Sequence, residues 1–490
     1  MNEPANSLSS WSANFLRPAF LFGLLFMACN LPGLAGTPPV QPTETPRISP
    51  APPPVNTNLP PTSIPLPAEP ADFILYNAFV LTINPAQPQA RAIAVREGRI
   101  QAVGDEAEVM ALAGPDTRLI DLQNSAVLPG FVDTHSHLFG GDFQDLAGGQ
   151  DAAISVGITT LAEMSVVPAG LEAIYAAEAA GALRMRISVY PVLIDNCGNP
   201  LGFWFENYPP SLPPGAKLQL PGVKIFTDGG SCNSPAVSYE YPGGIGHGDL
   251  YFTSEELAAL LVEAQSRGYQ AAIHAIVDRA IEMTQEAISQ ALAGGPNTFR
   301  HRIDHNAVLP AELMPRYQQI GIFPQIFGKF PACYWRGDTS QFKYVTPEEY
   351  REYEWPWRAL LDANPGVHFG WHGDYPVFGS LAPLDHLFGF VTRAEWAPDG
   401  TLCEPPDWAA NDAITVEEAL EIMTLGSAYA LFRESEIGSL EPGKLADLVI
   451  MTDNPLLIDP LDFRNIKIMA TVVGGETVFC AEGEEAYCPC

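Results

Sequence analysis

Two histidines separated by one residue, His135 and His137, follow an apolar stretch that passes through Pro129 and Gly130. Successive side chains of a β-strand point to opposite faces, so residues two apart share a face and both imidazoles point the same way. Two neutral imidazoles on one strand can supply half of the ligands of a divalent metal ion. This stretch alone leaves open the alternative of a strand-end histidine pair without a ligand.

Three more potential ligands end strand-like stretches further along the chain. His274 follows the apolar run 271–273, His305 closes the sequence Arg-Ile-Asp-His, and Asp374 follows His372 and Gly373. Each alone is more often a structural histidine or a turn-forming aspartate. Because they end strands of one predicted barrel, we expect them to meet at a shared site. A carboxylate there can bind a metal and take a proton from bound water.

Lys224 lies between Val223 and Ile225 in another apolar stretch. A charged lysine inside a buried parallel strand is costly in free energy unless it is paired. Two interpretations stay open. The amine forms a salt bridge with a nearby acid, or carboxylation turns it into a carbamate that bridges two metal ions.

The elements that position these residues alternate between strands and helices. Two of the helices begin at capping boxes, Thr253-x-x-Glu256 and Thr415-x-x-Glu418. Eight strands with intervening helices over roughly 300 residues predict an α/β fold, a (β/α)8 barrel, whose chemistry gathers at the carboxyl ends of the strands. The predicted strands are residues 127–135, 157–164, 186–193, 223–227, 269–274, 299–305, 320–326 and 367–373.

Further β-rich segments flank the predicted barrel on both sides. Turn signals at Glu97-Gly98 and Gly474-Gly475 separate runs that alternate as hairpin strands do. We therefore expect residues 71–127 and 438–480 to form one small β-sandwich domain, and residues 128–437 to form the barrel.

The N-terminal segment has the pattern of an export signal. The apolar run 18–28 is shorter than the roughly 20 residues that span a bilayer, which fits the core of a signal peptide. Ala28-Cys29 resembles a bacterial lipobox, in which the cysteine is lipidated, although Phe26 stands where leucine is usual. We predict a lipoprotein signal peptide over residues 1–29. A plain cleaved signal and an uncleaved anchor are the alternatives.

The segment after Cys29 predicts a tether. Of the 47 prolines, 16 lie in the first 70 residues, and such a sequence cannot bury a core. At about 3.1 Å per residue, residues 30–70 can reach on the order of 100 Å. We therefore expect an exported lipoprotein held at a bacterial membrane surface.

Charge and cysteine content limit the partners and the compartment. The 25 basic against 57 acidic residues give a formal net charge of -32, which argues against nucleic-acid binding. Export permits disulfides among the seven cysteines other than Cys29, and Cys480 can pair with Cys488 or Cys490, the latter two in the tail 481–490. The odd number leaves at least one thiol free or paired between chains. The oligomeric state stays open.

The candidate ligands and the motifs around them resemble the amidohydrolase superfamily, in particular the amidohydrolase-3 branch that includes N-substituted formamide deformylases. The similar motifs are Ala-Val-x-x-Gly-Arg-Ile-x-x-Val-Gly at 94–104, Leu-Pro-Gly-Phe-Val-Asp-x-His at 128–135, His-Ala-x-x-Asp-Arg-Ala at 274–280 and Gly-x-Leu-x-Pro-Gly-Lys-x-Ala-Asp at 438–447. Together they cover about residues 72–480. Several motifs in the right order make the resemblance specific.

The resemblance implies a role for each candidate ligand. One metal is held by His135, His137 and Asp374, a second by His274 and His305, and carboxylated Lys224 bridges the two. A hydroxide between the metals attacks a carbonyl, and Asp374 passes the proton to the leaving nitrogen. Zinc is the default metal, iron or manganese would suit the same ligands, and members of the family differ in whether they hold one or two ions.

Four residues are candidates for substrate contact. His372 stands where this branch often has Gly-Ser-Asp, and it contacts substrate, orders a neighbouring ligand or lies in a surface loop. Trp204 and Trp335 lie in aromatic loops after strands three and seven, where they line the site or cover helices. Arg279 follows strand five and pairs with a substrate carboxylate or with a neighbouring acid.

The sequence therefore predicts a metal-dependent hydrolase of C–N bonds, acting on an amide, N-acyl or cyclic amide substrate. Two alternatives stay open. One is an esterase, lactonase or phosphoesterase that uses the same site. The other is a lipid-anchored binding protein on a hydrolase scaffold that has lost its activity.

Overall fold

The computed structural model describes residues 69–489 apart from 231, 242, 245 and 336–345. The predicted signal peptide with Cys29 and nearly all of the predicted tether lie outside the described residues. The described residues lie within one compact unit, Leu66–Cys490. In this part of the chain, none of the helices combines the length and the apolar character that crossing a bilayer needs.

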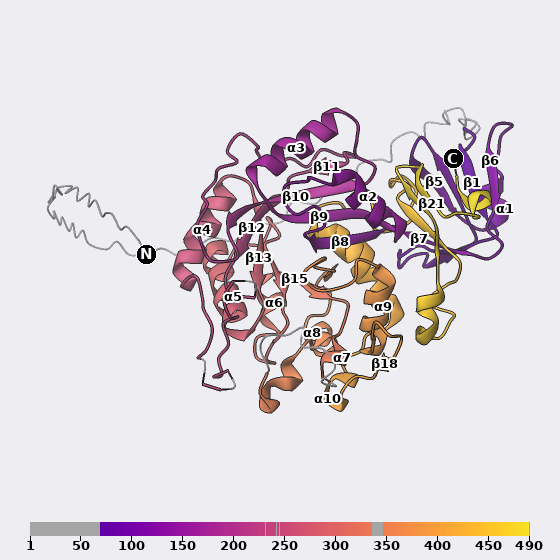
Figure 1. The fold of residues 1–490 in the computed structure, drawn as a ribbon. Coiled ribbons are helices and arrows are strands. Elements are labelled where there is room, and N and C mark those ends of the chain that lie inside the picture. The colour runs from indigo at the N-terminus through magenta and orange to yellow at the C-terminus, as the bar shows by residue number, and fades with distance from the viewer. Residues whose placement is uncertain (1–68, 231, 242, 245, 336–345, 490) are drawn as a thin grey trace, which may run out of the picture. The chain divides into compact units, whose positions relative to one another are not determined.

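In the described chain, eight parallel strands form the predicted barrel (Figure 1). The last strand lies beside the first, because the Thr134 hydroxyl donates to the Trp371 carbonyl oxygen at 2.8 Å and the Asp374 N–H donates to the His135 carbonyl oxygen at 3.0 Å. The strands in order are β8 (Phe131–Ser136), β9 (Ile158–Val166), β10 (Arg186–Ile194), β12 (Gly222–Phe226), β13 (Gln270–Ala275), β14 (Arg302–His305), β15 (Phe323–Phe327) and β16 (Gly370–His372).

Helices follow the barrel strands and pack their apolar faces against them. Both predicted capping boxes are confirmed, at Thr253 before α4 and at Thr415 before α11. The helices of the barrel are α2 (Leu146–Ser155), α3 (Pro168–Ala179), α4 (Ser254–Ser266), α5 (Asp278–Leu292), α6 (Arg316–Ile320), α7 (Ala332–Trp335), α8 (Trp357–Ala363), α9 (Pro383–Thr392), α10 (Asp407–Ala410), α11 (Val416–Glu421) and α12 (Ser427–Ala430). Shorter elements are β11 (Leu218–Gln219), η1 (Glu348–Tyr353), β17 (Glu395–Trp396), β18 (Leu402–Cys403) and the π-helical η2 (Ile422–Gly426).

The first predicted strand divides into two at Gly130. Residues before it form β7 (Ala126–Pro129) in a flanking sheet, and residues after it form β8 of the barrel. A Cβ at Gly130 would lie 2.2 Å from the side chain of Thr159, so no larger residue fits where the chain passes from one sheet to the other. The predicted seventh strand also starts too early, because Ile320 ends α6 and Gly321 terminates that helix in the left-handed conformation.

The flanking segments form two sheets that share one apolar core, as a β-sandwich requires. Figure 1 shows strands from the two ends of the described chain side by side. One sheet has the order β5-β4-β1-β6 and the other β21-β20-β19-β7-β2-β3, so both flanks contribute to the second sheet. Leu75 and Val95 from the first sheet pack with Ile450 and Val472 from the second. The elements are β1 (Phe73–Tyr76), β2 (Phe79–Leu81), β3 (Gln89–Ala90), β4 (Ala92–Arg96), β5 (Arg99–Gly104), α1 (Glu106–Met110), β6 (Arg118–Asp121), β19 (Leu448–Met451), η3 (Pro460–Asn465), β20 (Ile468–Val473), β21 (Glu476–Cys480) and η4 (Glu485–Tyr487).

A buried ion pair joins the barrel to this flanking domain. Arg186 of β10 donates from Nε and Nη2 to the two carboxylate oxygens of Asp447, at 2.6 and 2.9 Å. Asp447 also accepts the backbone N–H of Gly474 at 2.7 Å, in the turn between β20 and β21. A bidentate pair with both partners buried fixes orientation as well as contact.

Three disulfides join six of the seven cysteines other than Cys29. They are Cys197–Cys232, Cys333–Cys403 and Cys480–Cys488. The last is one of the two pairings that the sequence allows for Cys480. The seventh cysteine, Cys490, lies outside the described residues.

Candidate metal centre

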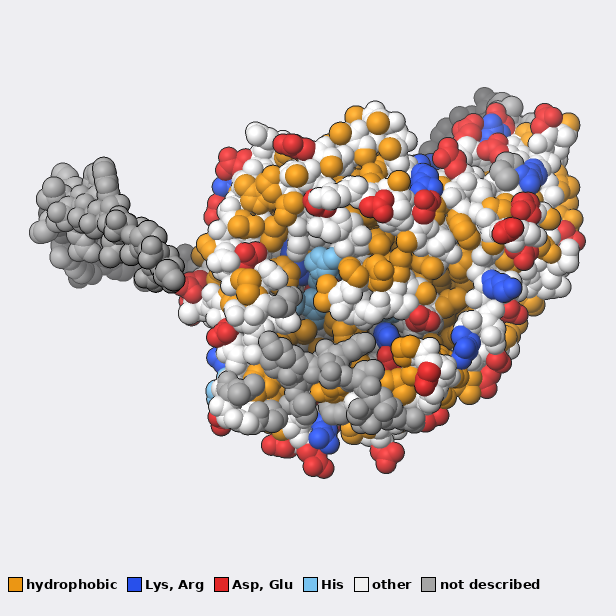
Figure 2. All heavy atoms as spheres, in the orientation of Figure 1, with side chains coloured by type: hydrophobic (Ala, Val, Ile, Leu, Met, Phe, Trp, Pro, Cys, Tyr) orange, Lys and Arg blue, Asp and Glu red, His pale blue; other side chains and the backbone are white. Residues whose placement is uncertain are grey.

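The carboxyl ends of the barrel strands surround a cavity of about 820 Å³. Figure 2 shows histidine side chains at the bottom of a hollow in this face of the molecule. Of the six predicted ligands, five line the cavity: His135, His137, His274, His305 and Asp374. Lys224 is fully buried and does not reach the cavity surface.

Three of these side chains form a compact group that suits one divalent ion. The Nε2 atoms of His135 and His137 lie 3.4 and 3.5 Å from Asp374 Oδ1. One ligand atom from each of the three residues falls within 4.8 Å of the others. Two imidazoles and a carboxylate are ligands that zinc and other first-row metals share.

His305 and His274 continue the site on the next side of the barrel. The His305 ring centroid lies 4.7 Å from that of His135 and 4.5 Å from that of His274. Both ring nitrogens of His305 are buried, and neither has a hydrogen-bond partner among the described residues. Because an unpaired buried polar atom is costly, a bound cation would supply what this imidazole lacks. His274 Nε2 lies 3.0 Å from the Gly229 carbonyl oxygen, which leaves Nδ1 as the candidate ligand atom.

Lys224 has an acidic neighbour, as the salt-bridge interpretation requires. Its Nζ lies 3.6 Å from Asp304 Oδ2 and 4.7 Å from the ring centroid of Phe226. Burial lowers the pKa of Lys224 to about 8, although Asp304 acts in the opposite direction. The carbamate interpretation stays a prediction. A lowered pKa favours it, because only the neutral amine adds carbon dioxide.

Asp304 is a buried carboxylate that the sequence analysis missed. It accepts a hydrogen bond from His135 Nδ1 at 2.7 Å, and its other oxygen lies 3.2 Å from Arg302 Nε. With Nδ1–H donating to Asp304, His135 directs its Nε2 lone pair toward Asp374, as metal-bound histidines do. Asp228 stands in a similar relation to His274, at 3.3 Å from Nε2. The signal in the sequence is an acidic residue at or just after the end of a predicted strand: Asp304 stands directly before the candidate ligand His305, and Asp228 follows Thr227.

Asp133 ties the first strand to the loop that carries Asp374. Its Oδ1 accepts the backbone N–H of His135 at 3.0 Å and that of Gly373 at 3.3 Å. Burial raises the pKa of Asp133 to about 7, and these two hydrogen bonds oppose the change. The carboxyl therefore holds the backbones of two candidate ligand segments at a fixed separation.

Burial sets the protonation of the candidate ligands in the direction that metal binding needs. It lowers the pKa of His137 to about 3, with the charge of Lys224 as the next cause, and it lowers the pKa values of His135 and His305 strongly. The imidazoles of these three residues are therefore neutral, which is the form that binds metals. Burial also raises the pKa of Asp374 to about 8, against the effect of Lys224, and a bound cation would reverse this change.

The four predicted substrate residues lie in different surroundings. His372 is buried below the cavity, 4.2 Å from the Phe327 ring and 5.1 Å from the His135 ring between centroids, so the surface-loop interpretation is wrong. Trp204 is half-buried and donates from Nε1 to the Val192 carbonyl oxygen at 2.9 Å, which holds it against strand three instead of in the cavity lining.

The other two predicted substrate residues are Arg279 and Trp335. Arg279, the second residue of α5, lines a separate cleft with Asp278 and Glu282 and is not among the described residues that line the metal cavity. The side chain of Trp335, the last residue of α7, lies outside what the structure describes.

Comparison with known proteins identifies the family. The family model described as "amidohydrolase family" matches residues 144–479. This chain belongs to the amidohydrolase family. The resemblance noted in the sequence is thereby confirmed, and the barrel and the composite flanking domain agree with it.

The sequence similarity to individual relatives extends over only part of this amidohydrolase. It is 30% identical to "Protein LONG AFTER FAR-RED 3" of Arabidopsis thaliana over 271 residues. These residues make up 54% of this chain and 43% of the relative. It is 26% identical over 265 residues to the N-substituted formamide deformylase of Arthrobacter pascens, 52% of this chain and 44% of that protein. The chain thus matches less than half the length of these curated relatives. A solved metal-dependent hydrolase of uncharacterized function from Pyrococcus furiosus shares the fold, with a TM-score of 0.64 at 18% identity over 78% of this chain and 99% of that one.

Proposed function

We propose that this amidohydrolase hydrolyses a C–N bond of a small amide, N-acyl or cyclic amide compound with the help of one or two divalent metal ions. The observation that carries the proposal is the group formed by His135, His137 and Asp374 at the base of a cavity large enough for a small molecule. The similarity to an N-substituted formamide deformylase supports a C–N substrate.

The chain's own residues account for binding and proton transfer in this reaction. A divalent ion bound here would lower the pKa of a water molecule to about 7 and polarise the substrate carbonyl. Asp374 accepts the proton of the attacking water and then donates it to the nitrogen as the C–N bond breaks. Asp304 keeps the proton of His135 on Nδ1, so that Nε2 stays available as a ligand.

The number and identity of the metals are part of the proposal. Zinc suits the nitrogen and oxygen ligands, and a carboxylated Lys224 would add a ligand for a second ion. The ion pair of Lys224 with Asp304 supports the competing arrangement, in which the amine stays unmodified and one ion is bound.

Two other functions would use the same structure. An esterase, lactonase or phosphoesterase would use the same metal ligands but cleave a different bond. Activity measured on a panel of matched amides and esters distinguishes these enzymes. A binding protein on an inactive scaffold would have no need of a complete ligand set. All six candidate ligand positions carry metal-binding residue types, which favours an enzyme.

Metal removal should abolish the activity. We expect protein purified with zinc to hold one to two ions per chain, to lose amide hydrolysis on chelation, and to regain it when zinc or manganese is added. Metal content by elemental analysis and amide hydrolysis are measured on the same samples. Full activity at less than 0.1 ion per chain, roughly a tenth of what even a one-metal site requires, would contradict the proposal.

We further propose that the enzyme is exported and anchored through lipid on Cys29. The apolar run and Cys29 lie before a proline-rich segment that can act as a spacer. We expect labelled palmitate to be incorporated into the full chain expressed in a bacterium, and Cys29→Ser to lose both the label and membrane fractionation. Equal labelling of the wild type and of Cys29→Ser would show that this cysteine carries no lipid. A Cys490→Ser variant is the matched control.

A further inference from the structure

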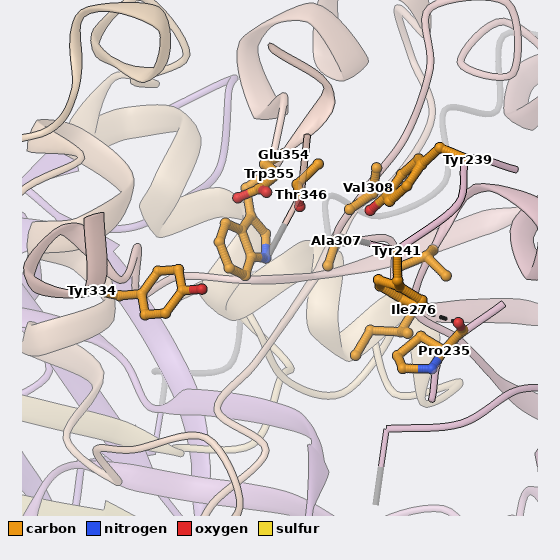
Figure 3. A pocket seen from close by; sticks show the side chains of 11 residues that line it. Pro235, Tyr239, Tyr241, Ile276, Ala307, Val308, Tyr334, Thr346, Glu354 and Trp355 are labelled. Atoms are coloured by element: carbon orange, nitrogen blue, oxygen red, sulfur yellow. Dashed lines mark hydrogen bonds between the residues drawn. The ribbon is translucent and has the colours of Figure 1, made fainter. Parts of the chain in front are cut away.

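A second, smaller pocket, here called the side pocket, adjoins the metal cavity. Eleven of the described residues line it, among them Tyr239, Tyr241, Ile276, Ala307, Val308 and Trp355 (Figure 3). Its lining shares Pro235, Ile276, Ala307 and Trp355 with that of the metal cavity.

The position of the side pocket relative to the metal ligands follows from the strand ends. Ile276 and Ala307 each lie two residues beyond a candidate ligand, His274 and His305. Two residues of extended chain span at most about 7 Å. The lining of the side pocket therefore begins within about 7 Å, along the backbone, of these two candidate ligands. It lies beyond β13 and β14, whereas Asp374 follows β16, two and three strands away around the barrel.

Three polar side chains of the side pocket, those of Tyr239, Tyr241 and Glu354, bond to protein groups. The Tyr241 hydroxyl donates to the Pro235 carbonyl oxygen at 2.9 Å, and the side chains of Tyr239 and Glu354 both hydrogen-bond to Thr346. Burial raises the pKa of Glu354 to about 8, against the effect of Thr346, so this carboxyl is neutral at pH 7. The surface that the described residues offer a ligand is therefore mainly apolar and aromatic.

The size of the side pocket limits what it can hold. Its volume is about 70 Å³. One water-sized group needs roughly 10–15 Å³ on this measure, so the side pocket has room for about five to seven such groups. A cavity that encloses one benzene ring has roughly 150 Å³, so the side pocket holds one branched alkyl group, or part of a six-membered ring whose remainder lies in the adjoining metal cavity. A fused second ring exceeds it further.

We propose that the side pocket binds the acyl substituent of the substrate, and that this substituent is a single aromatic ring or a compact branched alkyl group. The leaving nitrogen must lie beside Asp374 to receive a proton, so the group on the other side of the carbonyl extends toward β13 and β14. The inference rests on the proposed function, and it assigns the substrate class within it: amides of arylacetic or branched aliphatic acids.

Changes at Val308 test this assignment, because Val308 lines the side pocket but not the metal cavity. The substrates are the N-methylamides of acetic, phenylacetic and 2-naphthylacetic acid. The wild type should prefer phenylacetyl over acetyl at least tenfold in kcat/KM, and Val308→Phe should lower the ratio of the phenylacetyl value to the acetyl value by about 10- to 100-fold. Val308→Ala, which enlarges the side pocket, should raise the naphthylacetyl value. Val262→Phe, on the exposed face of α4, is the matched control.

A ligand without a hydrolysable bond separates the failure of this inference from the failure of the proposed function. Benzyl methyl sulfone should bind the metal-loaded wild type at least tenfold more tightly than dimethyl sulfone by calorimetry, and Val308→Phe should abolish the difference. If no amide is hydrolysed but this preference is found, the proposed function is wrong and the side pocket assignment stands. Equal binding of the two sulfones, or a preference that depends on the amine substituent and not on the acyl group, overturns the assignment.

Discussion

Asp374→Asn is expected to lower kcat for amide hydrolysis by about 10³-fold or more, with KM changed only a few-fold. General acid–base catalysis contributes about 10²–10⁴ in rate, and an amide side chain can neither accept the proton of water nor return it to nitrogen. The substitution lowers kcat more than it changes KM, because the proton is transferred in the transition state and not when the substrate binds. The measurement is steady-state kinetics at saturating added zinc, since Asp374 Oδ1 also lies 3.4 Å from His135 Nε2 and its loss weakens a metal site.

Asp195→Asn is the matched control for this substitution. Asp195 lines the same cavity, but its carboxylate accepts the backbone N–H groups of Cys197 and Asn199 in a turn. We therefore expect its replacement to change kcat less than about tenfold. A metal-loaded Asp374→Asn variant with kcat within tenfold of the wild type would remove Asp374 from proton transfer.

The candidate ligands could be predicted because their signals are local. His135 and His137 show the spacing of one strand face, and His274, His305 and Asp374 each stand at or just after the end of a strand-like stretch. In a parallel barrel all strands end on the same face, so local patterns combine into one site without knowledge of contacts. The helix starts at Thr253 and Thr415 were predictable for the same reason, since a capping box needs only four consecutive residues.

The residues that orient the ligands could not be predicted, because they depend on the geometry of the barrel. In an extended strand Asp304 and His305 would point to opposite faces. His305 instead has φ of 86°, which ends the regular strand, and both side chains approach His135. Left-handed backbone costs a non-glycine residue roughly 1–3 kcal/mol and is concentrated at functional sites. No periodic pattern in the sequence predicts that the strand ends in this conformation at His305.

Loop residues were the least predictable part of the site. Trp204 and Arg279 were chosen by their place after strands three and five, but a loop can turn its side chains toward or away from the barrel axis. Trp204 donates back to the Val192 carbonyl oxygen, and Arg279 lines a separate cleft. The side pocket comes instead from small and aromatic residues such as Ala307, Val308 and Trp355, whose types alone carry no functional signal.

Asp304→Asn should weaken metal binding by about 10- to 100-fold, because the carboxylate that orients a metal-bound histidine also raises its basicity. The substitution keeps the shape of the side chain but removes the charge that faces His135, Lys224 and Arg302. Metal affinity is measured by competition with a chelator, and kcat at saturating metal should stay within about tenfold of the wild type, since Asp304 transfers no proton in the reaction.

Asp447→Asn distinguishes loss of orientation at the metal site from general loss of stability. Asp447 is equally buried and equally charged, and its partner Arg186 joins the barrel to the flanking domain without contact to a candidate ligand. Removing one charge of a buried pair costs about 3–5 kcal/mol in stability, so this variant should unfold at lower urea concentration yet bind metal as the wild type does. If Asp447→Asn loses as much metal affinity as Asp304→Asn, the effect is global. If neither variant loses metal affinity, the hydrogen bond from His135 Nδ1 to Asp304 does not set the geometry of the site. The direction of the Nε2 lone pair must then come from the packing of the His135 imidazole against His137, His305 and His372.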